Sequence, residues 1–158
     1  MIKPARRDSD VDDAAQIWAE ATAARDGDDE VADLRDSRPI IQAVLDRSPR
    51  SMVLIARAAD GTATGFAAVE PVPGGRDTAR LSYLGVRHGM WGQGIAERLL
   101  AELRLRLRAG AFTRAELSVY ADNQRAVALY ERLGWQSTGE PTPHPRTGRP
   151  EQRYQLTL

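Results

Sequence analysis

The residues best suited to chemistry lie in a glycine-rich turn. Gly89, Gly92 and Gly94 follow a β-rich run that ends at Val86, and a stretch with helical spacing starts near Ile95. Glycine lets the main chain approach a bulky anion, and the free amides and dipole of a helix N-terminus attract phosphate. The pattern therefore predicts either a pyrophosphate cradle or a tight strand-to-helix turn that binds nothing.

Two known phosphate-binding motifs do not fit this turn. The phosphate-binding loop of nucleoside triphosphatases needs Lys and then Ser or Thr after its last glycine, but Ile95 and Ala96 stand there. A dinucleotide-binding fingerprint needs a third glycine three residues after Gly94, where this chain has Glu97. Both motifs are therefore excluded.

Further candidates lie near a second strand-to-helix connection. Asn123 has a side chain that is preferred at a helix N-cap, and Tyr130 lies on the apolar face of the helix that follows. Residue type alone favours a cap for Asn123 and a core aromatic for Tyr130. His88 could be a ligand or a base, but a single loop histidine is more often solvated.

The elements that must position these residues follow a mixed order. We expect strands at 2–6, 52–58, 65–69, 79–86, 114–120, from 135 onward and at 153–158, and helices at 10–24, from Pro39, from Ile95 and from Asn123. The proline-rich segment 141–150 is expected to be a long loop. This order predicts a mixed α/β (α+β) fold, with one central sheet of about seven strands and helices on both faces.

Composition narrows the classes of protein that fit. The 158 residues suit a single domain spanning 1–158, and the 22 basic and 22 acidic side chains cancel, which weighs against a nucleic-acid binder. Cysteine is absent, which excludes disulfides, thiolate metal sites and cysteine nucleophiles and favours a reducing compartment. No run of about 18 apolar residues is present, so we expect a cytoplasmic protein without a membrane span.

Two motifs stand at the two strand-to-helix connections. The first comprises Val86, Gly92, Gly94, Ile95 and Ala96. The second comprises Asn123, Ala126, Leu129, Tyr130, Gly134 and Trp135. Both resemble, in residue type and spacing, the motifs of the GNAT superfamily of acyl-CoA-dependent N-acetyltransferases. The order of elements agrees along essentially the whole chain. The resemblance implies a GNAT-type fold with a splayed cofactor cleft, opened where the strands ending at Val86 and Tyr120 part, with Gly85 as the bulge that parts them.

The resemblance also implies an activity and a site. The chain would transfer an acetyl group from acetyl-CoA to a primary amine by direct attack. The implied cofactor-binding residues are Leu84, Gly85, Val86, Trp91, Gly92, Gln93, Gly94, Ile95, Ala96, Asn123 and Tyr130. The main chain of Leu84 to Val86 would pair with the pantetheine arm as an added strand, and the amides from Trp91 to Ala96 would hold the pyrophosphate. Tyr130 would be the general acid for the departing thiolate.

The chain departs from the family at the general base. Its strand 79–86 carries no acid, and Ser118 stands where some members place Glu. Glu70 and Glu116 are the remaining candidates, although most surface carboxylates have no chemical role. The base is therefore left unassigned. Trp91 also replaces the usual Arg or Gln, which matters little if the cradle works through main-chain amides.

The acceptor and the class of function stay open. The acidic stretch 26–33 does not fit a calcium loop, because Val31 stands where Gly is needed and Ser37 where Glu is needed, so no metal site is predicted. Its acids could favour a cationic amine, whereas Arg146 and Arg149 favour the opposite. One alternative is a CoA-binding regulatory or interaction module without turnover, and another is an acyltransferase acting on a protein N-terminus or an aminoacyl-tRNA. The oligomeric state is also open, a homodimer included.

Overall fold

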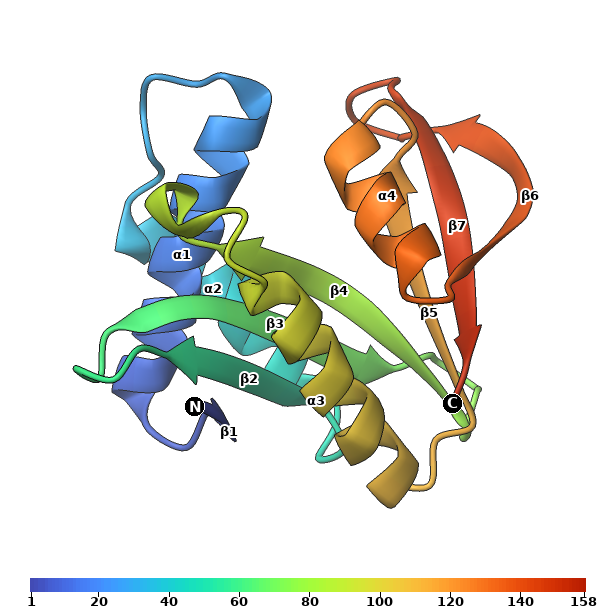
Figure 1. Cartoon of the computed structure of the whole chain (residues 1–158), viewed down its shortest axis with the longest axis horizontal. Coiled ribbons are helices and arrows are strands. Elements are labelled where there is room, and N and C mark those ends of the chain that lie inside the picture. The colour runs from blue at the N-terminus through green and yellow to red at the C-terminus, as the bar shows by residue number, and fades with distance from the viewer.

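The computed structural model describes residues 1–158, and its elements follow the predicted order (Figure 1). The strands are β1 (Ile2–Pro4), β2 (Met52–Arg57), β3 (Ala63–Pro71), β4 (Thr78–Val86), β5 (Arg114–Tyr120), β6 (Gln136–Pro143) and β7 (Pro150–Thr157). The helices are α1 (Asp8–Asp26), α2 (Leu34–Asp46), α3 (Ile95–Ala109) and α4 (Gln124–Arg132), with a 3-10 turn η1 (His88–Met90) before α3. None of the helices combines the length and the apolar character needed to cross a membrane.

One mixed sheet of seven strands organises the molecule, in the order β1-β2-β3-β4-β5-β7-β6. β4 and β5 are parallel and pair only where Thr78 to Arg80 face Arg114 to Glu116. Beyond this short ladder β4 continues to Val86 and β5 to Tyr120 without pairing, and the two halves of the sheet diverge in Figure 1. We call the gap between residues 81–86 of β4 and 117–120 of β5 the splay. The predicted mixed sheet of about seven strands, splayed where the strands ending at Val86 and Tyr120 part, is confirmed.

Two hydrophobic cores lie on opposite faces of the sheet. The alternation of side chains along β3 shows this, because Phe66 and Ala68 pack against α1 and α2, whereas Ala67 and Val69 pack on the side of α3 and α4. Every residue of β3 except its last is buried, as expected for a strand covered on both faces. The sheet, which is packed on both faces, is therefore the scaffold that positions the functional loops.

The bulge in β4 lies at Ser82 and not at Gly85. Ala68 pairs with Tyr83 and Val69 pairs with Leu81, so Ser82 is the extra residue. Gly85 is regularly paired with Phe66. A Cβ at Gly85 would lie 2.7 Å from the ring of Phe66, so the glycine makes room for that ring. The expectation that Gly85 marks the bulge is wrong for this reason.

The second helix starts earlier than predicted. α2 begins at Leu34, which places Pro39 inside the helix rather than in its first turn. Proline inside a helix removes one main-chain hydrogen bond. An ion pair between Arg38 and Asp12 of α1, at 2.6 Å, holds the turn just before the proline in place. Tertiary contact therefore extends the helix beyond the boundary that local residue type indicates.

The loop in the proline-rich segment is shorter than expected. β6 runs to Pro143 and β7 begins at Pro150, which leaves only His144 to Arg149 as the connection. β6 is an edge strand, where a proline does not interrupt a ladder on its outer side. The long loop expected at 141–150 and the last strand expected to start at Arg153 are both wrong in extent.

Candidate active site

The turn between β4 and α3 presents free main-chain amides. Gly92 and Gly94 have φ values of 79° and 75°, in the left-handed region that favours glycine, and Gly94 is the N-cap of α3. The N–H groups of residues 92–97 have no acceptor within the protein, and the first one bonded is that of Arg98, which donates to the carbonyl of Gly94. The turn therefore offers a row of donors at the positive end of a helix.

Basic side chains surround this turn. The guanidinium of Arg125 on α4 lies 5.0 Å from the centre of the Trp91 ring, and Arg98 donates to the carbonyl of Gln93 at 3.2 Å. The acid nearest the turn, Glu97, is paired with Arg132 of α4 at 3.0 Å. The charge around the free amides therefore suits an anion such as pyrophosphate.

The edge of β4 that faces the splay has main-chain groups without strand partners. Arg87 donates its N–H to the carbonyl of Thr64 on β3. Hydrogen bonding alternates along an antiparallel ladder, so the main-chain groups of Gly85 also bond β3, and those of Leu84 and Val86 face the splay. The Val86 carbonyl already accepts the indole N–H of Trp91 at 2.9 Å. Leu84 and the N–H of Val86 remain available for an added strand.

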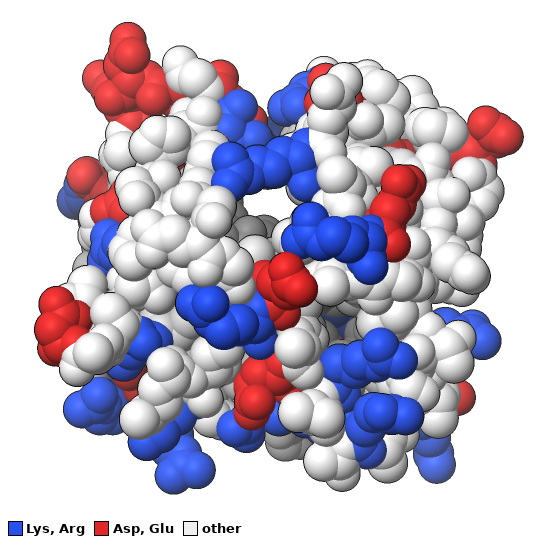
Figure 2. Space-filling view, in the orientation of Figure 1, with Lys and Arg blue, Asp and Glu red and all other residues white.

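Contacts on the α1 side close the splay at both ends. At one end Arg80 of β4 pairs with Glu116 of β5 at 3.0 Å. At the other end, the guanidinium of Arg25 in α1 lies 5.3 Å from the centre of the Tyr120 ring. Asp26 lies 3.6 Å from Arg149, which is in the turn between β6 and β7. Figure 2 shows Lys and Arg side chains gathered around a hollow between the two halves. The splay is therefore an opening with charged ends.

Tyr130 lies in the core beneath α4 with only its tip accessible. Its side chain is 7% exposed and packs against the rings of Trp135 and Tyr154. The hydroxyl has no hydrogen-bond partner, and the only fully buried side-chain atoms without partners are the hydroxyls of Ser37 and Ser51, so the Tyr130 hydroxyl reaches accessible space. Burial raises the pKa of Tyr130 above its usual value of 10.0. The phenol therefore stays protonated, as a proton donor must.

Asn123 is the N-cap of α4. Its side-chain oxygen accepts the N–H of Ala126 at 3.3 Å. Its side-chain nitrogen has no partner within the protein, so the cap leaves two donors free. The predicted capping role is present in the structure, and it does not exclude contact with a ligand.

The two carboxylates considered as bases are both held in ion pairs. Glu70 is buried and receives two hydrogen bonds from Arg47, at 2.8 and 3.0 Å. Glu116 receives two from Arg80, at 3.0 and 3.2 Å. Both carboxylates therefore already have an arginine partner. Neither residue has the free carboxylate that a general base needs.

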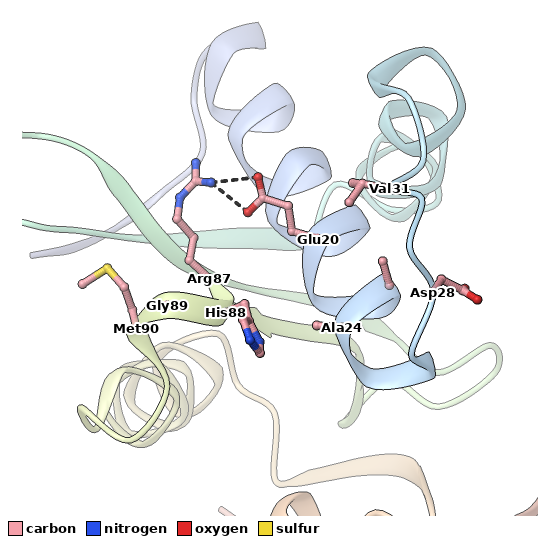
Figure 3. Close-up of a pocket in the computed structure, with 9 residues that line it drawn as sticks. Glu20, Ala24, Asp28, Val31, Arg87, His88, Gly89 and Met90 are labelled. Atoms are coloured by element: carbon pink, nitrogen blue, oxygen red, sulfur yellow. Dashed lines mark hydrogen bonds and ion pairs between the residues drawn. The ribbon is translucent and has the colours of Figure 1, made fainter.

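A pocket of about 470 Å³ lies between the end of α1 and the turn after β4 (Figure 3). Its lining residues are Glu20, Ala23, Ala24, Asp28, Val31, Arg87, His88, Gly89 and Met90. Glu20 and Arg87 face each other at 2.9 Å, whereas the carboxylate of Asp28 points away from them. His88 packs edge to face against the ring of Trp91 at 4.5 Å. Glu20 and Arg87 escaped the sequence analysis because no local pattern links positions 67 residues apart.

Comparisons with known proteins agree with this geometry. Residues 11–135 match the family model described as the acetyltransferase (GNAT) family. The ribosomal-protein-alanine N-acetyltransferase from Brucella melitensis has a TM-score of 0.80 at 23% identity, over 100% of this chain and 99% of that one. The ribosomal-protein-S18-alanine N-acetyltransferase from Escherichia coli has a TM-score of 0.78 at 23% identity, over 100% of this chain and 93% of that one. The acetyltransferase yncA from Salmonella typhimurium, solved with its cofactor acetyl-CoA, has a TM-score of 0.75 at 21% identity, over 100% of this chain and 93% of that one.

Proposed function

The chain belongs to the GNAT acetyltransferase family, and on that premise we propose that it transfers the acetyl group of acetyl-CoA to a primary amine of a small molecule or peptide. The observation that carries this proposal is the row of free amides at residues 92–97, which lies at the end of a β4 edge that is itself unpaired. An anion on the turn and an extended arm along the edge would satisfy both sets of main-chain groups.

The residues at the turn and the edge divide the binding of acetyl-CoA between them. The amides of residues 92–96 would hold the diphosphate, with Arg98 and Arg125 supplying positive charge. The N–H of Trp91, expected to take part, is not available, because it donates to the carbonyl of His88 at 3.4 Å. The main-chain groups of Leu84 would bond the pantetheine arm, which leaves the N–H of Val86 for the thioester. The free side-chain nitrogen of Asn123 would donate to the same arm or to the phosphates.

The chemistry proposed for the site is a direct acyl transfer. The amine nitrogen attacks the thioester carbonyl, the C–N bond forms and the C–S bond breaks, with no intermediate attached to the enzyme. The N–H of Val86 would polarise the carbonyl oxygen. The hydroxyl of Tyr130, which is accessible and protonated, would donate to the leaving sulfur, which takes the electron pair of the broken bond.

Calorimetry with acetyl-CoA, followed by an assay of thiol release on a panel of amines, tests the proposal. The panel contains small primary amines, diamines and a peptide with N-terminal alanine, because two of the matched solved structures are named as alanine N-acetyltransferases. We expect saturable binding of acetyl-CoA and thiol release with at least one amine. Binding without turnover on any amine would favour the CoA-binding module, and absence of binding would overturn both.

A further inference from the structure

The proposed transfer needs a group that removes a proton from the acceptor. An amine with a pKa of about 10.4 is uncharged in roughly one molecule per thousand at pH 7. Most carboxylates around the splay are already bound by arginines. These pairs are Glu116 with Arg80, Glu20 with Arg87, Asp26 with Arg25, and Asp122 with Arg149. A carboxylate without an arginine partner on the α1 side of the sheet is therefore the best candidate for the base.

Glu151 at the start of β7 lies on that face. Tyr154 and Leu156 of β7 point into the core beneath α4, so Glu151, of opposite parity, points to the other side of the sheet. Its partner on β5 is Tyr120, and directly opposed residues share a face. Arg25 at the end of α1 reaches the ring of Tyr120, which shows that this face borders the splay.

The Glu151 side chain is partly buried and has no hydrogen bond or ion pair within the protein. Two arginines lie two residues from Glu151 along the chain. Arg149 bonds Asp122 at 2.8 Å and lies 3.6 Å from Asp26, and Arg153, on the same face of β7, forms no ion pair with Glu151. Glu151 is therefore a carboxylate with open acceptor capacity on the face of the sheet that α1 borders, one strand beyond the splay.

Glu151 is also a diagonal neighbour of Ser118. Ser118 pairs with Arg153, two residues along β7, so Glu151 lies one step away on the same face, at a typical separation of about 7–8 Å. A glutamate side chain can span that separation, either alone or through a bridging water. Ser118 itself is exposed and carries no carboxylate.

We propose that Glu151 is the general base of the acyl transfer, an inference that rests on the proposed function. Its carboxylate accepts a proton from the acceptor ammonium, directly or through one water, and releases it to solvent after the reaction. The freed lone pair forms the C–N bond as the C–S bond breaks. After attack, the nitrogen loses a second proton to solvent. Solvent returns a proton to Tyr130, whose hydroxyl has protonated the leaving sulfur.

Other charged and titratable groups surround Glu151 and enter the interpretation of any pH profile. They are Tyr120 on β5, His144 and Arg149 in the β6–β7 turn, Arg153 on β7 itself, and Arg25 and Asp26 at the end of α1. Thr142, which pairs with Glu151 on β6, carries no charge. The test therefore follows the ionisation of the acceptor amine rather than that of the enzyme.

The experiment compares kcat/KM for an active amine in the wild type, Glu151→Gln and Glu140→Gln between pH 7 and 10. Glu140 is an exposed carboxylate of β6 and is the matched control. We expect Glu151→Gln to lose about 10²-fold at pH 7, the usual contribution of a general base. The loss should shrink steadily toward pH 10, because the amine then loses its proton to solvent. Glu140→Gln should follow the wild type throughout.

A deficit of Glu151→Gln that is the same at every pH, or no deficit at all, would overturn the assignment. Acetyl-CoA affinity by calorimetry and the circular dichroism melt should match the wild type. If Glu151→Gln does not fold, Glu151→Thr takes its place: a deficit that shrinks toward pH 10 supports the proposal, and a flat or absent deficit refutes it. Failure of the wild type on every amine would instead sink the proposed function.

Discussion

Trp91 donates its indole N–H to the main-chain carbonyl of Val86, five residues earlier in the chain, at 2.9 Å. This carbonyl belongs to the edge of β4 that has no strand partner, so a side chain of the protein occupies part of the surface proposed for the pantetheine arm. The ring itself is held between His88 and Arg125. The indole donor and an arriving amide N–H would therefore compete for one acceptor.

Replacing Trp91 by Phe should tighten acetyl-CoA binding. Phenylalanine keeps an aromatic ring beside His88 and Arg125 but has no donor for the Val86 carbonyl. Removing one competing hydrogen bond is worth about 1 kcal/mol, so we expect Kd to fall by roughly 3- to 10-fold in calorimetry. An unchanged or weaker Kd would mean that the Val86 carbonyl takes no part in binding.

Replacing Gly94 by Ala should weaken acetyl-CoA binding and lower stability. Alanine at φ 75° is strained by about 1–2 kcal/mol, and its Cβ would lie 3.4 Å from a guanidinium nitrogen of Arg98. Relief of the strain would rotate the free amides of the turn, so we expect about a tenfold rise in Kd if one of their hydrogen bonds is lost. Gly89→Ala is the control, because Gly89 has no positive φ and open space for a Cβ. Equal effects at both positions would argue against the cradle.

Tyr130→Phe should slow turnover and leave binding and stability intact. The Tyr130 hydroxyl has no partner within the protein, so its removal orphans no buried group. Loss of a proton donor to the leaving sulfur should lower kcat by about 10²-fold. Calorimetry should give the wild-type Kd for acetyl-CoA, and the melting temperature should stay within about 2 °C. Unchanged kcat would remove Tyr130 from the mechanism.

The raised pKa of Tyr130 has a consequence at alkaline pH. Burial favours the neutral phenol, so the folded protein binds this proton more tightly than the unfolded chain does. The resulting stability is fully present below about pH 10 and is lost as the pH rises further. Urea midpoints of the wild type should therefore decline above pH 10 more steeply than those of Tyr130→Phe. Parallel declines would contradict the burial of the phenol.

The sequence predicts the order of elements and the glycine turn because both depend on neighbouring residues. Strand β5 is predicted to the residue, since its ends are marked by turn residues on both sides. The free amides at residues 92–97 follow from the position of two glycines at the head of a helix. Patterns of this kind predict structure because the residues that determine it lie within about ten positions of one another.

The features that the sequence leaves out depend on contacts between distant segments. The bulge at Ser82 follows from how β4 fits β3, and nothing in the local residue types distinguishes it from Gly85. Glu151 draws attention only when β5 and β7 are aligned and the other acids are seen to be paired. Ion pairing between segments thus decides which carboxylate is available, and that cannot be read from spacing.

Asp10 should be a main source of acid sensitivity. It is 7% exposed, and its carboxylate accepts the N–H groups of Arg6 and Arg7 at 2.9 and 3.1 Å. Arg57 donates to it at 2.7 Å. Burial alone would raise the pKa of Asp10, but hydrogen bonds from both amides and the guanidinium outweigh it and lower the pKa. The stability that Asp10 contributes is therefore present above about pH 4 and is lost as the pH falls through the lowered value.

Asp10→Asn keeps the shape of the side chain but removes its charge and one acceptor oxygen. We expect a loss of about 1–3 kcal/mol in the free energy of unfolding at pH 7, measured by urea denaturation. The gap between wild type and variant should narrow from pH 5 to pH 3, because the wild type then loses the same charge. Asp29→Asn, at an exposed carboxylate without partners, should change neither value. A gap that stays constant with pH would mean that Asp10 stabilises the N-terminus of α1 through shape and neutral hydrogen bonds alone.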